Sequence, residues 1–242
     1  MKILSIFVFT FLIGTFTSAT AIGETIWKDF RITYLQGNNY LVGDNKREIW
    51  TFEHASKSTW GDTFLFIDRT NSSEQGASTY GEFSPRIKVA NFDGFIKALY
   101  IAPSVEMGTV NNYLYGIGTD LNLPYFHFFQ FNFYLRNNGI GDNSEQITLS
   151  WGVPIGPLYY DGFVDYATGV TQTRIDGSTT KSAKQLNFTS QLKYDIGPHF
   201  NLSNKLYIGI EYVFWNNKFG IDSSEQFRTD ERNVNLLIKA HF

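Results

Sequence analysis

The chain has 242 residues, of which 43% are hydrophobic, 17% aromatic and 18% charged, with no Cys and a formal net charge of −3. The absence of Cys excludes a disulfide framework and a thiolate-bound zinc or iron–sulfur site. The small negative charge gives no basic surface for nucleic acid. Apart from the extreme N-terminus, no apolar run is long enough for a membrane-spanning helix.

The first residues have the layout of a secretory signal peptide. Lys2 supplies a positive charge, residues 3–17 are apolar, and Ala21 ends a short run of small residues. We expect cleavage after Ala21, which makes 1–21 the leader and 22–242 the exported domain. A permanent anchor helix is the weaker alternative, because the apolar stretch is short for a bilayer core of about 30 Å.

Beyond the leader, apolar and polar residues alternate with a period of two, which is the pattern of β-strands with one wet face. In 184–196, for example, Leu186, Phe188 and Leu192 fall on one face and Lys193 on the other. Most of the predicted strands are close to the length of about 9–11 residues that a tilted strand needs to cross a bilayer. The predicted strands, about twelve in number, are 27–36, 47–56, 62–69, 79–89, 95–103, 110–121, 125–136, 145–155, 158–167, 184–196, 204–215 and 232–242.

The links between these strands alternate in length. Short links such as 122–124 and 156–157 follow even-numbered strands. An even strand count with short periplasmic turns and longer extracellular loops is typical of outer-membrane barrels, which close because lipid cannot pair an open sheet edge. We therefore predict an all-β fold, a twelve-stranded antiparallel transmembrane β-barrel in the bacterial outer membrane. The longer polar links, after odd-numbered strands, are 37–46, 70–78, 137–144, 168–183 and 216–231.

The outward faces carry aromatic side chains near the predicted strand ends, where interfacial girdles lie. The chain ends in Phe242 on its last alternating strand, and a terminal Phe resembles the sorting signal that the outer-membrane assembly machinery reads. We expect this machinery, membrane lipid and lipopolysaccharide as partners. The candidate girdle residues are Tyr113, Tyr115, Trp151, Tyr166, Tyr194, Tyr212 and Phe214.

The opposite faces would line a lumen that is unusually rich in rings. A nucleobase stacked on such a ring gains about 1–3 kcal/mol, while carboxylates, Arg and Lys form charge-assisted hydrogen bonds with polar groups. Glu82 and Arg86 lie roughly 13 Å apart along one strand, so each needs a partner from another strand or from a solute. The pore-lining candidates for substrate binding are Glu53, Phe64, Phe66, Asp68, Glu82, Arg86, Phe126, Phe128, Tyr159, Asp161, Asp165, Lys193, Glu211 and Trp215.

Several stretches resemble the Tsx/OmpK family of nucleoside-specific channel-forming outer-membrane proteins. The resemblance follows family order from the second strand to the C-terminus, and 51–69 is its most specific part. It implies a monomeric barrel whose narrow pore favours nucleosides and deoxynucleosides, and members of the family also serve as phage or colicin receptors. The stretches are TFEHAS at 51–56, WGD at 60–62, FLFIDR at 64–69, YGEFSPR at 80–86, WNNKFG at 215–220 and the closing HF at 241–242.

Two other classes of function remain open. A receptor or adhesion barrel would have a plugged lumen and would bind phage or colicin through 168–183 and 216–231. An outer-membrane phospholipase would need a nucleophile and a base, for which His54 and Ser56 are the candidates. Residues two apart in a strand are about 6.6 Å apart, too far for nucleophile and base to share a proton, so we expect no enzyme activity. No motif indicates a metal or another cofactor.

Overall fold

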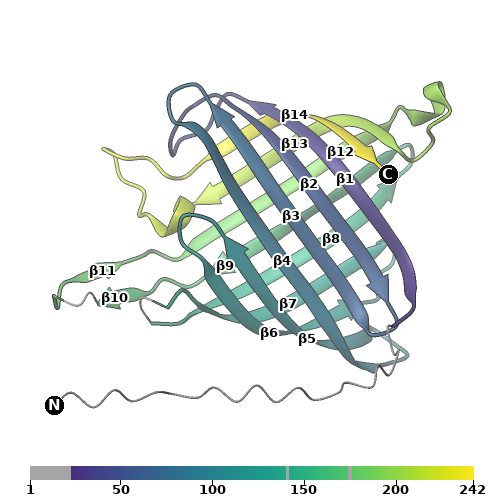
Figure 1. The fold of residues 1–242 in the computed structure, drawn as a ribbon, viewed down its shortest axis with the longest axis horizontal. Helices are drawn as coiled ribbons and strands as arrows, with labels where there is room; N and C mark the ends of the chain where they lie inside the picture. Colours follow the sequence, from purple (N-terminus) through teal and green to yellow (C-terminus); the bar gives the residue numbers. More distant parts are fainter. Residues whose placement is uncertain (1–22, 140–141, 174–175) are drawn as a thin grey trace, which may run out of the picture.

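The computed structural model describes residues 23–139, 142–173 and 176–242. Most of these residues form a closed antiparallel barrel of 12 strands, as the sequence predicts (Figure 1). Each strand pairs with its neighbours in the chain, and β1 pairs with β14 to close the sheet. The barrel strands are β1 (Thr25–Gly37), β2 (Arg47–Ser58), β3 (Gly61–Ser72), β4 (Gly76–Asn91), β5 (Ile96–Met107), β6 (Asn112–Leu121), β7 (Phe128–Asn137), β8 (Ser144–Ile155), β9 (Leu158–Ala167), β12 (Gln185–Asp195), β13 (Leu206–Asn216) and β14 (Arg232–His241).

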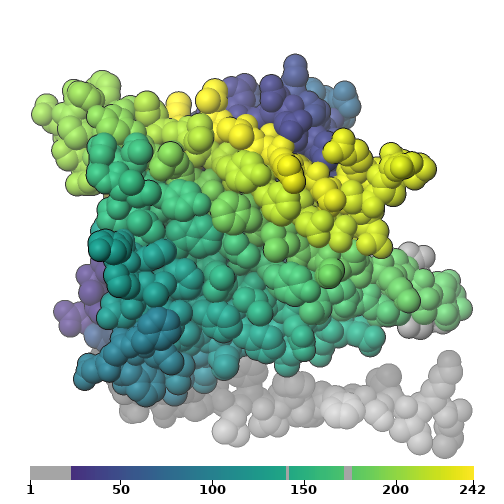
Figure 2. Space-filling model, turned by 180° about the vertical axis from the view of Figure 1, so that it is seen from behind, coloured from purple at the N-terminus to yellow at the C-terminus, as the bar shows by residue number. Residues whose placement is uncertain are grey.

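The predicted leader, 1–21, lies outside the described residues. Within the described residues, no helix is both long and apolar enough to cross a membrane. The regular helical structure in the part of the chain that the structure describes consists of two 3₁₀ turns, η1 (Gly197–Phe200) and η2 (Lys218–Gly220). Figure 2 shows the outer wall from behind as a continuous surface, along which the chain runs in colour order from blue to yellow.

The connections differ from the prediction at several places, among them the link 122–124, which extends to 127 because β7 begins at Phe128. The expected loop 70–78 shrinks to 73–75, because β3 and β4 extend beyond the predicted ends and Gly76 takes a left-handed conformation with φ of +72°. The link after β12, 196–205, is longer than expected and contains η1. The expected loop 168–183 contains a hairpin of its own, β10 (Thr171–Thr173) with β11 (Thr179–Lys181), which projects from the barrel in Figure 1.

Both termini of the barrel lie at one end. We call it the turn end, because the tight turns at 59–60 and 156–157 are there. The opposite loop end carries 38–46, 168–184 and 217–231. This division follows from an even number of strands, since the first and last strand then begin and finish on the same side.

The inner and outer faces of the strands have opposite chemistry. On β14, Asn235 and Lys239 are 0% and 2% exposed, whereas Leu236 and Ile238 are 65% and 50% exposed. A water-soluble fold would bury the apolar set and expose the polar one. The inverted pattern is stable only if the exposed apolar face contacts lipid and the polar face lines an interior, as in a transmembrane barrel.

Small inward residues make room for large ones inside the barrel. Tyr134 on β7 packs with Ala102 and Leu114 in a buried cluster and covers Gly116 on the neighbouring strand. A Cβ atom at Gly116 would overlap the Tyr134 ring and the carbonyl oxygen of Phe133. The absence of a side chain at Gly116 therefore leaves the space that the Tyr134 ring occupies.

We expect the Gly116→Ala change to lower the free energy of unfolding by about 1–3 kcal/mol, because the added carbon overpacks this cluster. Urea titration of the folded barrel in detergent measures the loss. The Gly81→Ala change is the control, since its Cβ would meet its nearest neighbour, the carbonyl oxygen of Phe66, at 3.1 Å. Equal losses in the two variants would contradict the packing argument.

Candidate functional site in the barrel lumen

The structure places the predicted lining residues on inward strand positions, with the exception of Phe126. The inward side is identified by the buried charged residues that meet there, such as Arg86, Lys193 and Lys239. Phe128, whose ring borders the inward Gly152, lies at the turn end. The assignment of these residues to substrate binding stays a prediction.

Phe126 is a correction to the sequence prediction. Tyr125 has a φ of +71°, which turns the chain, so that β7 begins only at Phe128. The ring of Phe126 packs edge-on against Phe129 at 5.5 Å between centroids. Phe129 pairs with the outward Trp151, so Phe126 belongs to the outer rim rather than to the lumen.

Trp151 itself also differs from the expectation for an interfacial girdle. It is 8% exposed, whereas Tyr115 and Tyr194 are exposed as a girdle requires. Its ring packs against Tyr160 and Phe188, with centroids 6.1 and 5.7 Å away. The residue paired with Trp151 on β9 is Gly162.

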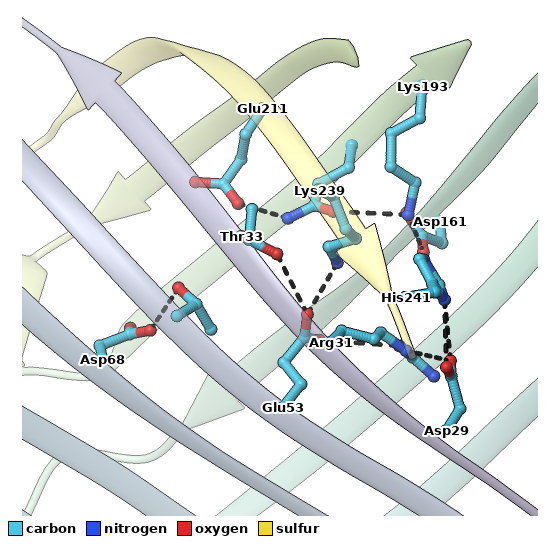
Figure 3. A network of polar contacts seen from close by, with 12 residues as sticks. Asp29, Arg31, Thr33, Glu53, Asp68, Asp161, Lys193, Glu211, Lys239 and His241 are labelled. Atoms are coloured by element: carbon cyan, nitrogen blue, oxygen red, sulfur yellow. Dashed lines mark hydrogen bonds and ion pairs between the residues drawn. The ribbon is translucent and has the colours of Figure 1, made fainter. Parts of the chain in front are cut away.

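A network of ion pairs crosses the seam at which the barrel closes (Figure 3). Arg31 on β1 contacts Asp29 at 2.6 Å and Glu53 on β2 at 3.7 Å. Lys239 on β14 reaches the same Glu53 at 2.8 Å, and His241 reaches Asp29 at 3.0 Å. These contacts tie the first two strands to the last one, and they occupy the polar atoms of Glu53 that the sequence assigned to solute binding.

A second ion pair lies beside aromatic rings toward the turn end. Lys193 on β12 donates to Asp161 on β9 at 2.6 Å. The Lys193 ammonium also lies 5.4 Å from the ring centroid of Tyr159, a cation–π distance. The ring of His127 is 5.5 Å from Tyr159, and Phe128 borders Gly152 on the same stretch of wall. The site therefore combines flat π-surfaces with a charged donor and acceptor.

Arg86 is clamped between two carboxylates that the sequence analysis did not single out. Its guanidinium contacts Asp62 through two nitrogens at 2.7 and 2.6 Å and Asp120 at 2.7 Å. It also lies 4.2 Å from the ring centroid of Tyr100, whose hydroxyl donates to Asp120 at 2.7 Å. The alternation that places Asp68 inward also places Asp62 inward, and the sequence therefore indicated the position of Asp62. The pairing of Arg86 with Asp120, two strands away, could not be predicted from this alternation.

Four inward carboxylates share a different environment. Their hydrogen bonds come from neutral side chains; for example, Thr51 donates to Asp68 and Thr148 donates to Asp165, both at 2.6 Å. Among the described residues, none of the four has a basic side chain within ion-pair distance. We call them the unpaired carboxylates: Asp68, Glu82, Asp165 and Glu211.

Further rings line other parts of the lumen. Phe64 and Phe66 lie 5.9 Å apart, and Tyr80 lies 5.7 Å from Phe66, so three rings follow one another along β3 and β4. Trp215 stands close to the loop end, where its ring packs against Phe219 at 5.7 Å. These rings supply further surfaces on which a planar solute could stack.

The candidate enzyme residues, His54 and Ser56, face outward from the barrel wall. His54 pairs with the outward Phe30, and Ser56 shares its face. No group of three or more His, Asp or Glu side chains within the described part of the chain is arranged to hold a metal ion.

Comparisons with known proteins agree with this architecture. No family model matches the chain. Outer membrane protein OmpK of Vibrio parahaemolyticus serotype O3:K6 (strain RIMD 2210633) is 25% identical over an alignment of 176 residues, and the match covers 60% of this chain and 65% of that protein. The match thus spans slightly less than two thirds of the relative's length.

Solved porins share the fold. The NanC porin superposes with a TM-score of 0.57 at 8% identity, covering 88% of this chain and 98% of the other. A KdgM porin in complex with disordered oligogalacturonate gives 0.52 at 10% identity, covering 88% and 99%. At these identities the likeness concerns the fold alone, and the chain is accordingly a porin-like barrel of the outer-membrane type.

Proposed function

We propose that this protein is a passive channel through which nucleosides and deoxynucleosides diffuse across the outer membrane. The observation that carries the proposal is the ring of Tyr159 beside the Lys193–Asp161 pair in the lumen. A nucleobase has a π-face that stacks on such a ring, and its ribose hydroxyls and base edges suit the adjacent ammonium and carboxylate. The similarity to OmpK and to the Tsx/OmpK family supports the same assignment.

A permeation site has to release what it captures, so its affinity is modest. In this lumen Lys193 Nζ and Asp161 Oδ2 already contact each other at 2.6 Å, whereas Asp161 Oδ1 has no partner among the described residues. A solute must therefore compete for the ammonium, while Asp161 Oδ1 can accept a hydrogen bond from it directly. This competition favours fast exchange, which is what a diffusion channel needs.

The test is conductance of the purified barrel in planar bilayers, with adenosine or thymidine added. We expect both nucleosides to block ion current at concentrations at which sugars and amino acids of similar size do not. Uptake into liposomes, measured with the same solutes, gives the matching transport rates. If the barrel conducts ions and nucleosides do not block the current, the channel function is supported and nucleosides as its cargo are contradicted.

The second candidate is a receptor barrel whose lumen does not conduct, with phage or colicin as the partner. It is favoured by the loop 38–46, which covers part of the lumen wall at the loop end. A properly folded barrel without conductance would support this candidate.

The unpaired carboxylates also predict charge selection. Where they are ionised, carboxylates without basic partners make the potential in the passage negative, which attracts cations and repels anionic nucleotides. We expect the wild-type channel to prefer potassium over chloride in alkaline solution, and the combined Glu82→Gln and Asp165→Asn changes to lower this preference by roughly two- to fivefold. The reversal potential in a KCl gradient measures it.

The control for charge selection is Glu145→Gln, because Glu145 is exposed on the outward face of β8. Its neutralisation should leave the reversal potential unchanged. Equal effects of the lumen and outer-face changes would mean that the lumen carboxylates do not set the selectivity.

The terminal residue is proposed to contact the assembly machinery. Phe242 is 67% exposed, and its ring lies 5.9 Å from Phe30 at the outer rim. An exposed ring at this position is accessible to a membrane-embedded partner before the seam closes.

A further inference from the structure

The loop between β1 and β2 folds over the lumen wall. The backbone N–H of Asn39 donates to Asn233 at 3.1 Å, and the hydroxyl of Tyr40 donates to Asn235 at 2.8 Å. Both asparagines face inward from β14 and are buried. Residues 38–46, which we call the mouth loop, therefore cover the inner face of β14 at the loop end.

One buried carboxylate joins the mouth loop to the last loop, 217–231. Glu231 Oε2 accepts a hydrogen bond from the backbone N–H of Leu41 at 2.8 Å. Its other oxygen, Oε1, lies 2.6 Å from Lys218 Nζ, and the two side chains are 0% and 6% exposed. Lys218 belongs to the WNNKFG stretch at 215–220, whose role the lumen does not explain.

The Lys218 ammonium is surrounded by rings as well. It lies 5.4 Å from the ring centroid of Tyr40, 5.4 Å from that of Phe219 and 5.7 Å from that of Trp215. Arg47 lies 4.7 Å from the Tyr40 ring. Tyr40 of the mouth loop thus contacts one cation from the barrel rim and one from the last loop.

The burial of this pair makes the arrangement sensitive to the loss of either charge. Burial lowers the pKa of Lys218, while the charge of Glu231 opposes that change. A buried charge without its partner is strongly unfavourable. If either charge is lost, the other becomes stable only when water reaches it, and water reaches it when the mouth loop moves away.

We propose that the Lys218–Glu231 pair is a latch that holds the mouth loop over the lumen, and that breaking the pair releases the loop and widens the channel entrance. This inference rests on the channel function proposed above. The residues involved lie at the loop end, away from the Tyr159 site, so the latch and the cargo can be tested separately.

The first test is single-channel conductance in KCl. We expect Glu231→Gln to raise conductance about twofold or more, because the released loop no longer narrows the entrance. The matched control is Asp230→Asn, since Asp230 contacts Asn216 and Asn217 within its own region of the chain. This control should conduct like the wild type.

The second test measures loop position without any current. The chain has no Cys, so Asn233→Cys introduces a single thiol at a buried inward position on β14 that the mouth loop contacts. We expect a membrane-impermeant maleimide to label this thiol about tenfold faster when Glu231→Gln is also present. In the Asp230→Asn background, the thiol should be labelled as slowly as in the protein that carries only the Cys change.

The outcomes separate the two proposals. Unchanged conductance and unchanged labelling in a Glu231→Gln barrel that migrates as folded protein would overturn the latch. If no variant conducts, the channel function fails, and the labelling rate alone decides on the latch. Should Glu231→Gln not fold, Lys218→Met takes its place with the same expected results.

Discussion

The Arg86→Met change is expected to lower the free energy of unfolding by about 3–5 kcal/mol, the usual loss when one partner of a buried ion pair is removed. Arg86 is 3% exposed, and it holds Asp62 and Asp120 on two different strands. Without the guanidinium, two carboxylates face each other in the lumen wall with no cation between them. Urea titration of the detergent-solubilised barrel, followed by tryptophan fluorescence, measures the loss.

Two controls separate charge from geometry in this cluster. Arg86→Lys keeps the charge but cannot contact both carboxylates with a planar fork, so we expect an intermediate loss. Lys57→Met removes a more exposed cation, 3.7 Å from Asp120. This change should lower the free energy of unfolding by less than about 1 kcal/mol. A loss for Arg86→Met no larger than that for Lys57→Met would show that the clamp is not a structural element.

The Tyr159→Ala change is expected to weaken nucleoside block by roughly tenfold, within the range of about 1–3 kcal/mol for stacking of one base on one ring. The ring lies beside the Lys193–Asp161 pair, so its removal takes away the π-surface and leaves the charged groups in place. The concentration of adenosine that halves the current in planar bilayers is the measured quantity. Folding is checked by the electrophoretic mobility of the unheated barrel.

Tyr159→Phe is the matched control for this prediction, because it keeps the ring and loses only the hydroxyl. Adenosine should block this variant at the same concentration as it blocks the wild type. Phe128→Ala tests the neighbouring ring, which borders Gly152, and we expect a weaker effect in the same direction. Unchanged block in both alanine variants would mean that these rings fill space in the lumen and do not bind the base.

The inward positions were predictable because lipid imposes a strict rule on the sequence. A strand with one face in lipid and one in a polar interior must alternate, and a shift by one residue would move every charge into the membrane. The alternation in 232–242 thus places Lys239 inward and Leu236 outward, as the structure has them. The rule fails where the chain leaves the strand, and Phe126 is such a case.

Partner choice inside the lumen was not predictable in the same way. The sequence indicates that Glu82 and Arg86 cannot pair with each other, and the structure agrees, since Glu82 bonds to Ser84 and Ser104. Alternation shows which face a side chain is on but not which strand lies opposite. Asp120 is therefore recognisable as a partner of Arg86 only in the folded barrel.

By itself, the sequence determined the strands, their even number and the polar inner face, because these follow from local periodicity and from the need to pair every backbone group in lipid. Only the tertiary structure decided where charges meet. Lys218 and Leu41 are far apart in the chain, yet both contact Glu231, because closure of β1 against β14 brings the first loop beside the last. Such long-range contacts depend on the curvature and closure of the whole sheet, which no local pattern encodes.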